Sequence, residues 1–368
     1  MYFRYIVLFI VFLMVLTSCL DFSGGCAEDF VEGRRKVYVT DLNGRFQSVE
    51  NEWRIGTYLS QSITIYGLDE SSNIFYYSDV YRLDPLKLFK VDLQTGIRSK
   101  IEFDLNGQNY VFSPNAKYLA YKKIVEEKYS TIAFYSIEDS TENSIQTDSL
   151  TGPRQMPKWA SNTEVAYNKY SLEGNGIGIF KTNIDDNATF QLTSMTPRWG
   201  SDIHEDQKSV VFSAETQSPT TGFSEASIFY SRQYDSLPKL IALGTYPYFI
   251  PKKNKIIYQN GNEIRLFDID TEEDINVFTA QRADLLYKNI AIANSGSFII
   301  LADITGVIKI DTETLQESYL VKSSDLFNEF DITKWDSPYF YFNAPIISSD
   351  DSKVYFILNI EVSANCDD

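Results

Sequence analysis

The stretch FSPNAKYLAY, residues 112–121, places a polar turn directly before an apolar strand. The chain repeats this arrangement seven times, and the strands that follow the turns begin at Ile74, Tyr118, Val165, Val210, Ile256, Phe298 and Val354. Successive starts are 44, 47, 45, 46, 42 and 56 residues apart. A period of about 40 to 45 residues built from strands alone is typical of a β-propeller, in which each repeat forms one blade.

Each repeat divides into four strands. In the clearest repeat, strands are predicted over 109–113, 118–122, 131–137 and 143–147. Six repeats are complete, whereas the last apolar strand, 354–360, is followed by no further strand, and residues 37–49 supply the missing pair. We therefore predict an all-β protein, a β-propeller of seven four-stranded blades whose last blade is closed by the N- and C-terminal strands. A six-bladed ring is the alternative, because the turn at 71–73 is the weakest of the seven.

Two segments of the repeat resemble a known class of propellers. The stretch 112–121 resembles the Ser-Pro-Asp-Gly-Lys turn of TolB-like, WD-repeat-like propellers, with Asn115 and Ala116 in place of Asp and Gly. Residues 189–193, TFQLT, are similar to the Leu-Thr ending of their outer strands. The resemblance covers residues 37–360 and implies a propeller fold, with six blades in TolB-like domains. A fold of this kind serves enzymes and binding proteins alike, so the resemblance predicts structure better than function.

The first residues have the features of a processing segment. Arg4 supplies a positive charge, and the twelve residues 5–16 are apolar but too few to span a membrane as a helix. The sequence Leu16-Thr17-Ser18-Cys19 that follows resembles the lipobox of bacterial lipoproteins. This resemblance implies cleavage before Cys19 and acylation of that residue, which gives a strong membrane anchor. An ordinary secretory signal with a chance cysteine is the alternative.

These features predict the organisation of the chain and its location. We expect a lipoprotein signal peptide over 1–18, a lipidated tether over 19–34 and a single propeller domain over 35–368. The resemblance to a lipobox implies that the protein resides in the bacterial cell envelope and that the lipid on Cys19 anchors it to the membrane. Leu20, where enterobacterial lipoproteins of the inner membrane have Asp, favours the outer membrane. The periplasmic and surface sides both remain open.

Two cysteines remain beside Cys19. Cys26 precedes the first predicted strand, and Cys366 follows the last one. An exported chain reaches an oxidising compartment, so we predict that Cys26 and Cys366 form a disulfide that closes the ring. Two free thiols on frayed termini are the alternative.

The residues that carry chemistry give no coherent catalytic set. His204 is the only histidine, which removes multi-histidine metal sites and leaves a solvated turn residue as the simplest interpretation. The acidic pairs at 185–186, 272–274 and 350–351 all fall in predicted turns, so we interpret them as turn residues, with calcium ligands or a glycosidase pair as alternatives. We expect no cofactor and no metal, and catalysis is the less favoured outcome. A net charge of -17 opposes binding to nucleic acid.

The repeat is interrupted most clearly at residues 323–338, where Phe327, Phe330 and Trp335 stand among acidic residues. Long loops on rigid scaffolds often bind partners, so these three residues form a candidate partner-binding loop. A loop that folds back over the propeller is the alternative. The leading hypothesis is a non-catalytic envelope lipoprotein whose propeller face or central channel binds a protein or peptide. A carbohydrate-binding or carbohydrate-active propeller, similar to lyases or glycosidases, is the alternative.

Overall fold

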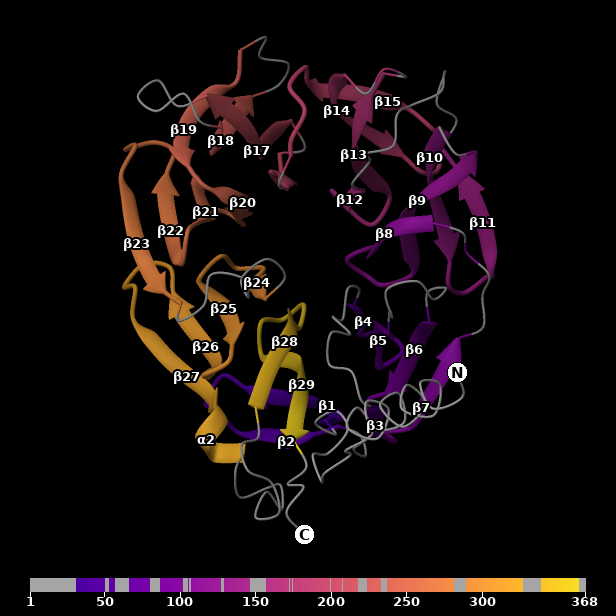
Figure 1. The fold of residues 1–368 in the computed structure, drawn as a ribbon, viewed down its shortest axis with the longest axis vertical. Helices are drawn as coiled ribbons and strands as arrows, with labels where there is room; N and C mark the ends of the chain where they lie inside the picture. The colour runs from indigo at the N-terminus through magenta and orange to yellow at the C-terminus, as the bar shows by residue number, and fades with distance from the viewer. Residues whose placement is uncertain are drawn as a thin grey trace, which may run out of the picture.

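The computed structural model arranges the chain as a ring of antiparallel sheets (Figure 1). It describes residues 31–49, 53–56, 66–79, 87–101, 105, 107–126, 129–145, 157–171, 173, 175–198, 200–206, 208–217, 224–232, 237–280, 289–326 and 339–363. Within these residues the strands form seven sheets, each of which is one blade. The predicted all-β, seven-bladed propeller is therefore confirmed, and the first turn, at 71–73, does join two strands of a blade.

Blades 1 to 6 each contain four consecutive strands, and the first strand of each lies nearest the centre of the ring (Figure 1). Blade 1 holds β4 (Tyr66–Asp69), β5 (Ile74–Asp79), β6 (Lys87–Asp92) and β7 (Arg98–Ile101). Blade 2 holds β8 (Gly107–Phe112), β9 (Tyr118–Glu126), β10 (Tyr129–Ser136) and β11 (Thr141–Ser144). Blade 3 holds β12 (Lys158–Trp159), β13 (Glu164–Tyr170), β14 (Gly176–Asn183) and β15 (Thr189–Thr193).

The next three blades follow the same order. Blade 4 holds β16 (Ser201–Ile203), β17 (Ser209–Gln217), β18 (Ser224–Arg232) and β19 (Lys239–Leu243). Blade 5 holds β20 (Thr245–Ile250), β21 (Lys255–Asn260), β22 (Glu263–Asp268) and β23 (Asp274–Thr279). Blade 6 holds β24 (Ile290–Ile292), β25 (Phe298–Asp303), β26 (Gly306–Asp311) and β27 (Glu317–Lys322). A single turn of helix, α2 (Ser323–Leu326), follows blade 6.

Blade 7 is built from both ends of the chain. Its strands, from the centre outward, are β28 (Tyr339–Ile347), β29 (Lys353–Ser363), β1 (Val31–Asp41) and β2 (Phe46–Ser48). The β1–β29 ladder runs from Val31 opposite Ser363 to Asp41 opposite Lys353. Strand β1 starts six residues before the strand expected at Val37, and β3 (Trp53–Gly56) pairs with this early part. Closure of the ring by the terminal strands is thus confirmed.

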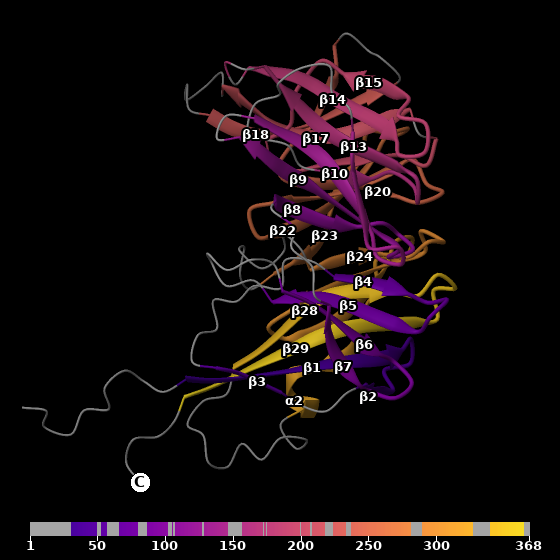
Figure 2. The same ribbon diagram turned by 90° about the vertical axis from the view of Figure 1, so that its right-hand side faces the viewer.

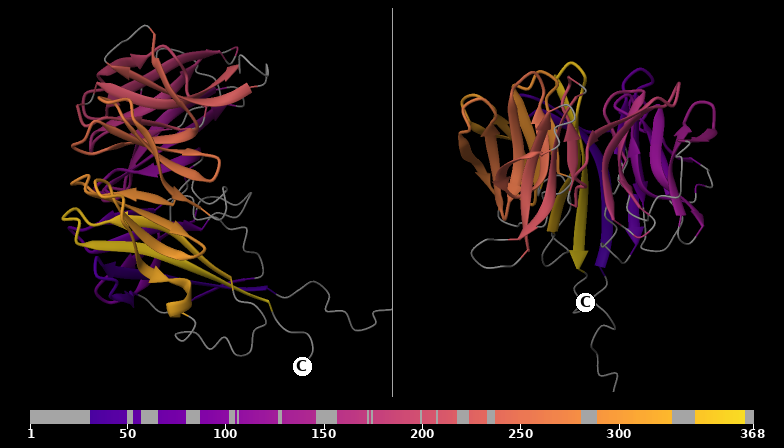
Figure 3. Two further views of the ribbon diagram at one scale, coloured as in Figure 1. Left: turned by 90° about the vertical axis from the view of Figure 1, so that its left-hand side faces the viewer. Right: turned by 90° about the horizontal axis from the view of Figure 1, so that it is seen from above.

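The strand order gives the ring two different faces. Turns between the first and second strands, and between the third and fourth strands, lie on one side, which we name the turn face. The other ends of the strands lie on the opposite side, which we name the loop face. Strand β1 begins and β29 ends at the loop face, and the views from the side and from above show both strands leaving the ring there (Figures 2 and 3).

The core lies between blades, because successive residues of a strand point to opposite neighbours. In β21, Ile256 packs on the side of blade 4 and Ile257 on the side of blade 6, and both are fully buried. Each central strand is therefore covered on both faces. This burial explains why the second strands read as continuous apolar runs instead of alternating ones.

The acidic residues that end the third strands organise the turns on the turn face. The Oδ1 atom of Asp92 accepts hydrogen bonds from the backbone N–H groups of Gln94 (2.9 Å) and Thr95 (2.8 Å). Asp311 does the same for Glu313 and Thr314. These N–H donors, Thr95 first and then Gln94, hold the pKa of Asp92 below its usual value. Part of the chain's acidity therefore serves local turn structure.

Candidate functional site

The residues singled out from the sequence as lipidation, disulfide and loop positions lie outside the described residues: Cys19, Cys26, Cys366, Phe327, Phe330 and Trp335. The beginning of the loop is described as α2, where Leu326 is fully buried in the cluster shared by blades 6 and 7. Among the helices in the described ranges, none combines the length and apolarity needed to cross a bilayer.

His204 stabilises a turn between β16 and β17. Its ring meets the ring of Phe249 edge-on, with centroids 5.0 Å apart, which ties blade 4 to blade 5. Its Nδ1 atom accepts a hydrogen bond from the backbone N–H of Asp206 (3.2 Å). The turn position is as expected, but the side chain is packed and 16% exposed instead of solvated.

Two of the three acidic groups take part in turns, whereas Asp274 of the third begins strand β23 and accepts a hydrogen bond from the hydroxyl group of Tyr258 (2.8 Å). Asp186 accepts the N–H of Ala188 (2.9 Å), and Asp350 accepts hydrogen bonds from the hydroxyl groups of Ser348 and Ser352. These two hydroxyl groups lower the pKa of Asp350 to about 2. Within the described part of the chain, no group of three or more His, Cys, Asp or Glu side chains is placed to hold a metal ion.

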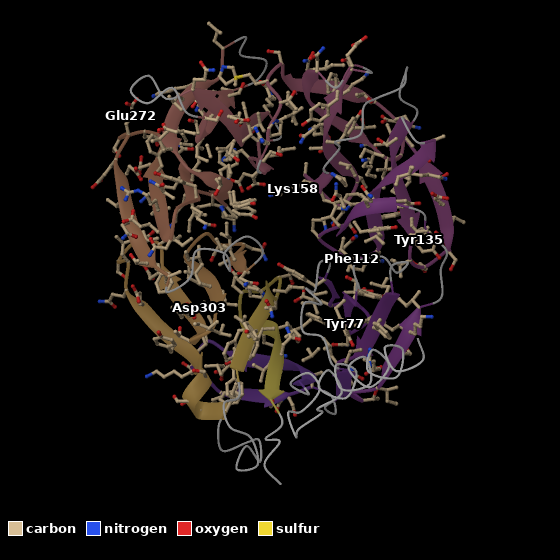
Figure 4. All side chains as sticks on the ribbon, in the orientation of Figure 1. Tyr77, Phe112, Tyr135, Lys158, Glu272 and Asp303 are labelled. Carbon is tan, nitrogen blue, oxygen red and sulfur yellow. The ribbon has the colours of Figure 1, made fainter. Side chains whose placement is uncertain are left out.

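A cluster at the centre of the ring joins the first strands of three blades. Lys158 of β12 lies with its Nζ 2.8 Å from Oδ1 of Asp202 on β16 and 4.5 Å from the ring centroid of Tyr248 on β20. The other carboxylate oxygen of Asp202 accepts the backbone N–H of Phe249 (2.8 Å). We name Lys158, Asp202 and Tyr248 the inner cluster. Figure 4 shows Lys158 beside the centre of the ring, whereas Glu272 lies at the outer rim.

The sequence did not indicate this cluster. Pro157-Lys158-Trp159 and Pro197-Arg198-Trp199 look like matching positions, yet Lys158 pairs with Asp202, which lies at the equivalent place on the next first strand. Trp159 is buried, and its Nε1 donates a hydrogen bond to the carbonyl of Val111 (3.0 Å) in blade 2. Trp199 lies outside the described residues.

Tyrosine recurs on the first strands. Five tyrosines there are only half-buried although seven blades surround them: Tyr66, Tyr110, Tyr246, Tyr248 and Tyr341. Three of them also pack against the clusters between blades, namely Tyr66, Tyr110 and Tyr248. Burial raises the pKa of Tyr110 to about 12, and its neutral hydroxyl group donates a hydrogen bond to the carbonyl of Leu105 (3.0 Å).

Three of the first strands are also bulged. The pairing register shifts between Gln108 and Val111 in β8 and between Thr245 and Tyr248 in β20, and a similar shift occurs in β28. Asn109 and Tyr246 adopt positive φ values of 55° and 52° inside the first two bulges. Bulges re-aim side chains, and a non-glycine residue in this conformation carries strain that the surrounding structure must hold.

No protein-family model matches the sequence, and no curated protein matches it. Solved structures do match the fold. A puromycin-hydrolysing peptidase of Mycobacterium tuberculosis matches with a TM-score of 0.53 and 8% identity over 80% of this chain and 52% of that chain. An oligogalacturonate lyase in complex with manganese matches with a TM-score of 0.51 and 9% identity over 83% of this chain and 90% of that chain.

TolB from Acinetobacter baumannii matches with a TM-score of 0.45 and 16% identity. The match covers 68% of this chain and 64% of that chain, so the present chain spans less than two thirds of the TolB structure. At identities this low the likenesses concern the fold alone. The seven sheets of the ring themselves confirm the propeller fold that the turn sequence implied, with one blade more than the six of TolB-like domains.

Proposed function

We propose that this chain is a non-catalytic binding protein whose first strands hold a protein or peptide partner along the axis of the propeller. One observation carries the proposal: half-buried tyrosines and the ion pair of Lys158 with Asp202 gather on the first strands of several blades. The described residues of this region offer hydrogen-bond donors, acceptors and aromatic surface.

The first strands suit peptide recognition for two physical reasons. Tyrosine buries a large ring at a small cost in side-chain entropy while its hydroxyl group still forms hydrogen bonds. In addition, each first strand pairs on one side only among the described strands, so its other edge can bond to an extended peptide. Lys158 and Asp202 together carry no net charge, so the inner cluster offers both a donor and an acceptor to the polar groups of a partner.

The cellular setting of this function is also a proposal. The lipobox at 16–19 supports attachment to the envelope through Cys19. Strand β1 begins at the loop face, only twelve positions after this cysteine, and an extended chain of that length reaches roughly 40 Å. A lipid on Cys19 would therefore keep the loop face near the membrane and direct the turn face away from it.

Site-specific photocrosslinking in native cells tests the proposal. A photoreactive phenylalanine analogue replaces Tyr248 in the inner cluster or, as the control, Tyr319 on the outermost strand β27, which is 42% exposed. We expect a defined protein adduct from position 248 and none from 319. Equal adducts from both positions, or none from position 248, would contradict the proposal.

The charge of Lys158 provides a second test once the partner sequence is known. Loss of a hydrogen bond to a charged group costs about 1.5–3 kcal/mol, so Lys158→Ala should weaken binding roughly tenfold or more in a fluorescence anisotropy titration. Lys252→Ala is the matched control, because Lys252 lies exposed on the turn face. Equal affinities of the two variants would exclude the inner cluster from recognition.

A further inference from the structure

A polar cavity lies at the outer rim of the ring, on the turn face between blades 2 and 3. Its volume is about 490 Å³, which falls in the range of small-molecule sites. One wall comes from β10, β11 and the turn between them, and the other from the turn between β14 and β15. We name this cavity the rim pocket. It is separate from the inner cluster, which lies on first strands.

The polar side chains of the rim pocket point at the cavity without partners of their own. Asp185, Asn187 and Asn143 line it, and their side chains make no hydrogen bond to any other described residue. Asp139 uses one carboxylate oxygen to accept the hydroxyl group of Ser136 (2.9 Å) and leaves the other uncommitted within the described structure. The acids at the turn position of Asp185 in two other blades are engaged: Asp270 accepts a hydrogen bond from Asn254 (2.9 Å), and Glu313 pairs with Lys253 (3.0 Å).

The lining restricts the chemistry of a ligand. Two carboxylates and no Lys or Arg are found among the described residues of the lining, so an anion would be repelled. A simple ammonium ion has three donors and no acceptor, so it would bond to the carboxylates but gain nothing from the amide N–H groups of Asn143 and Asn187. A sugar hydroxyl group donates and accepts, so it satisfies carboxylates and amides together.

The lining is mostly polar, and Phe134, Ile184 and Tyr118 add a smaller apolar part. Phe134 and Ile184 are each 7% exposed, and the ring of Tyr118 is stacked on that of Trp159 with centroids 6.0 Å apart. The surface of a sugar is mostly hydroxyl groups with smaller apolar C–H patches, which matches a mostly polar lining. We propose that the rim pocket binds a neutral saccharide of one or two sugar units.

The test measures binding of the full chain, purified in detergent, to an array of neutral mono- and disaccharides, followed by calorimetric titration of the best one. We expect saturable binding that Asn143→Ala and Asp185→Ala each weaken about tenfold, the loss of one hydrogen bond to a polar or charged group. Asp270→Ala is the matched control, because Asp270 holds in blade 5 the turn position that Asp185 holds in blade 3. All three side chains are exposed, so the variants should fold.

Three outcomes would overturn the proposal. The first is the absence of binding to every saccharide at about 10 mM, which is above the dissociation constants of weak, millimolar sites. The second is equal affinity of the wild type and both pocket variants for the saccharide. The third is tighter binding of an amine probe such as ethylammonium than of any saccharide. Each leaves the peptide-binding proposal standing, because Lys158 and Tyr248 take no part in the rim pocket.

Discussion

Asp351 joins the closing blade to blade 6, and its replacement tests whether side-chain contacts hold the ring shut. Its carboxylate oxygens accept the backbone N–H groups of Asn294 and Ser295, each at 2.8 Å. On the other side of the same turn, the N–H of Ser349 donates to Glu70 of blade 1 at 2.8 Å. Blade 7 is therefore tied to both neighbours at the turn face by carboxylates that accept backbone N–H groups.

The change Asp351→Asn isolates this contact. Asparagine tolerates the positive φ of 59° at this position, so the backbone need not change. Its oxygen can accept one N–H group, but its amide nitrogen then faces the second donor. A hydrogen bond to a charged group contributes about 1.5–3 kcal/mol, and exposure of Asn294 and Ser295 reduces this, so we expect a loss of about 1 kcal/mol in the free energy of unfolding.

Urea unfolding followed by tryptophan fluorescence measures the loss. For a chain of 368 residues, 1 kcal/mol corresponds to a decrease in Tm of about 1–2 °C, so the denaturant midpoint is the better observable. Lys252→Asn is the matched control, because Lys252 has a φ of 59° in the equivalent turn of blade 5 and makes no such bridge. If both variants unfold at the wild-type midpoint, Asp351 does not hold the ring closed.

Three further predictions concern pH, the cysteines and the anchor. Asp350 and Asp92 have pKa values in the folded state below the ordinary 3.8, so their stabilising effect is present above about pH 4 and is lost as the pH falls towards 2. Urea midpoints should therefore drop between about pH 4 and 2, and the drop should be smaller for Asp350→Asn than for the wild type. Since β1 and β29 bring the chain ends together, we expect non-reducing peptide maps to show a Cys26–Cys366 disulfide, and free thiols at both positions would disprove it. The disulfide should raise the free energy of unfolding by up to about 5 kcal/mol relative to the double serine variant. Labelling with palmitate should acylate wild type but not Cys19→Ser, and retention of the variant in membranes would refute lipid anchoring.

The fold was predictable because its signals are local. Ser113 and Ser348 each accept, through the hydroxyl oxygen, the N–H of the residue five positions later. Such turns depend on side chains close in sequence, and the strands between them are marked by continuous apolar runs. The start of β1 at Val31 was missed, because residues 31–36 carry few apolar side chains and are recruited by pairing with β29.

The inner cluster and the rim pocket were not predictable, because their members come from different blades. Lys158 and Asp202 are 44 positions apart and are joined only when two first strands meet at the centre. In the sequence, Asn143 lies in a predicted strand and Asp185 in a predicted turn, and neither position is unusual. Only the three-dimensional arrangement shows that their side chains are left without internal partners, while Asp92 and Asp311 are engaged.

The pairing of β1 with β29 sets the timing of folding. Strand β1 is among the first parts of the propeller to be synthesised, yet its ladder partner follows more than 300 residues later. Contacts of such long range form slowly, and until they form blade 7 has unpaired edges. Blades 1 to 6 can assemble as the chain emerges, but the ring cannot close before β29 is available. The early strand would therefore need protection from other strand edges until then.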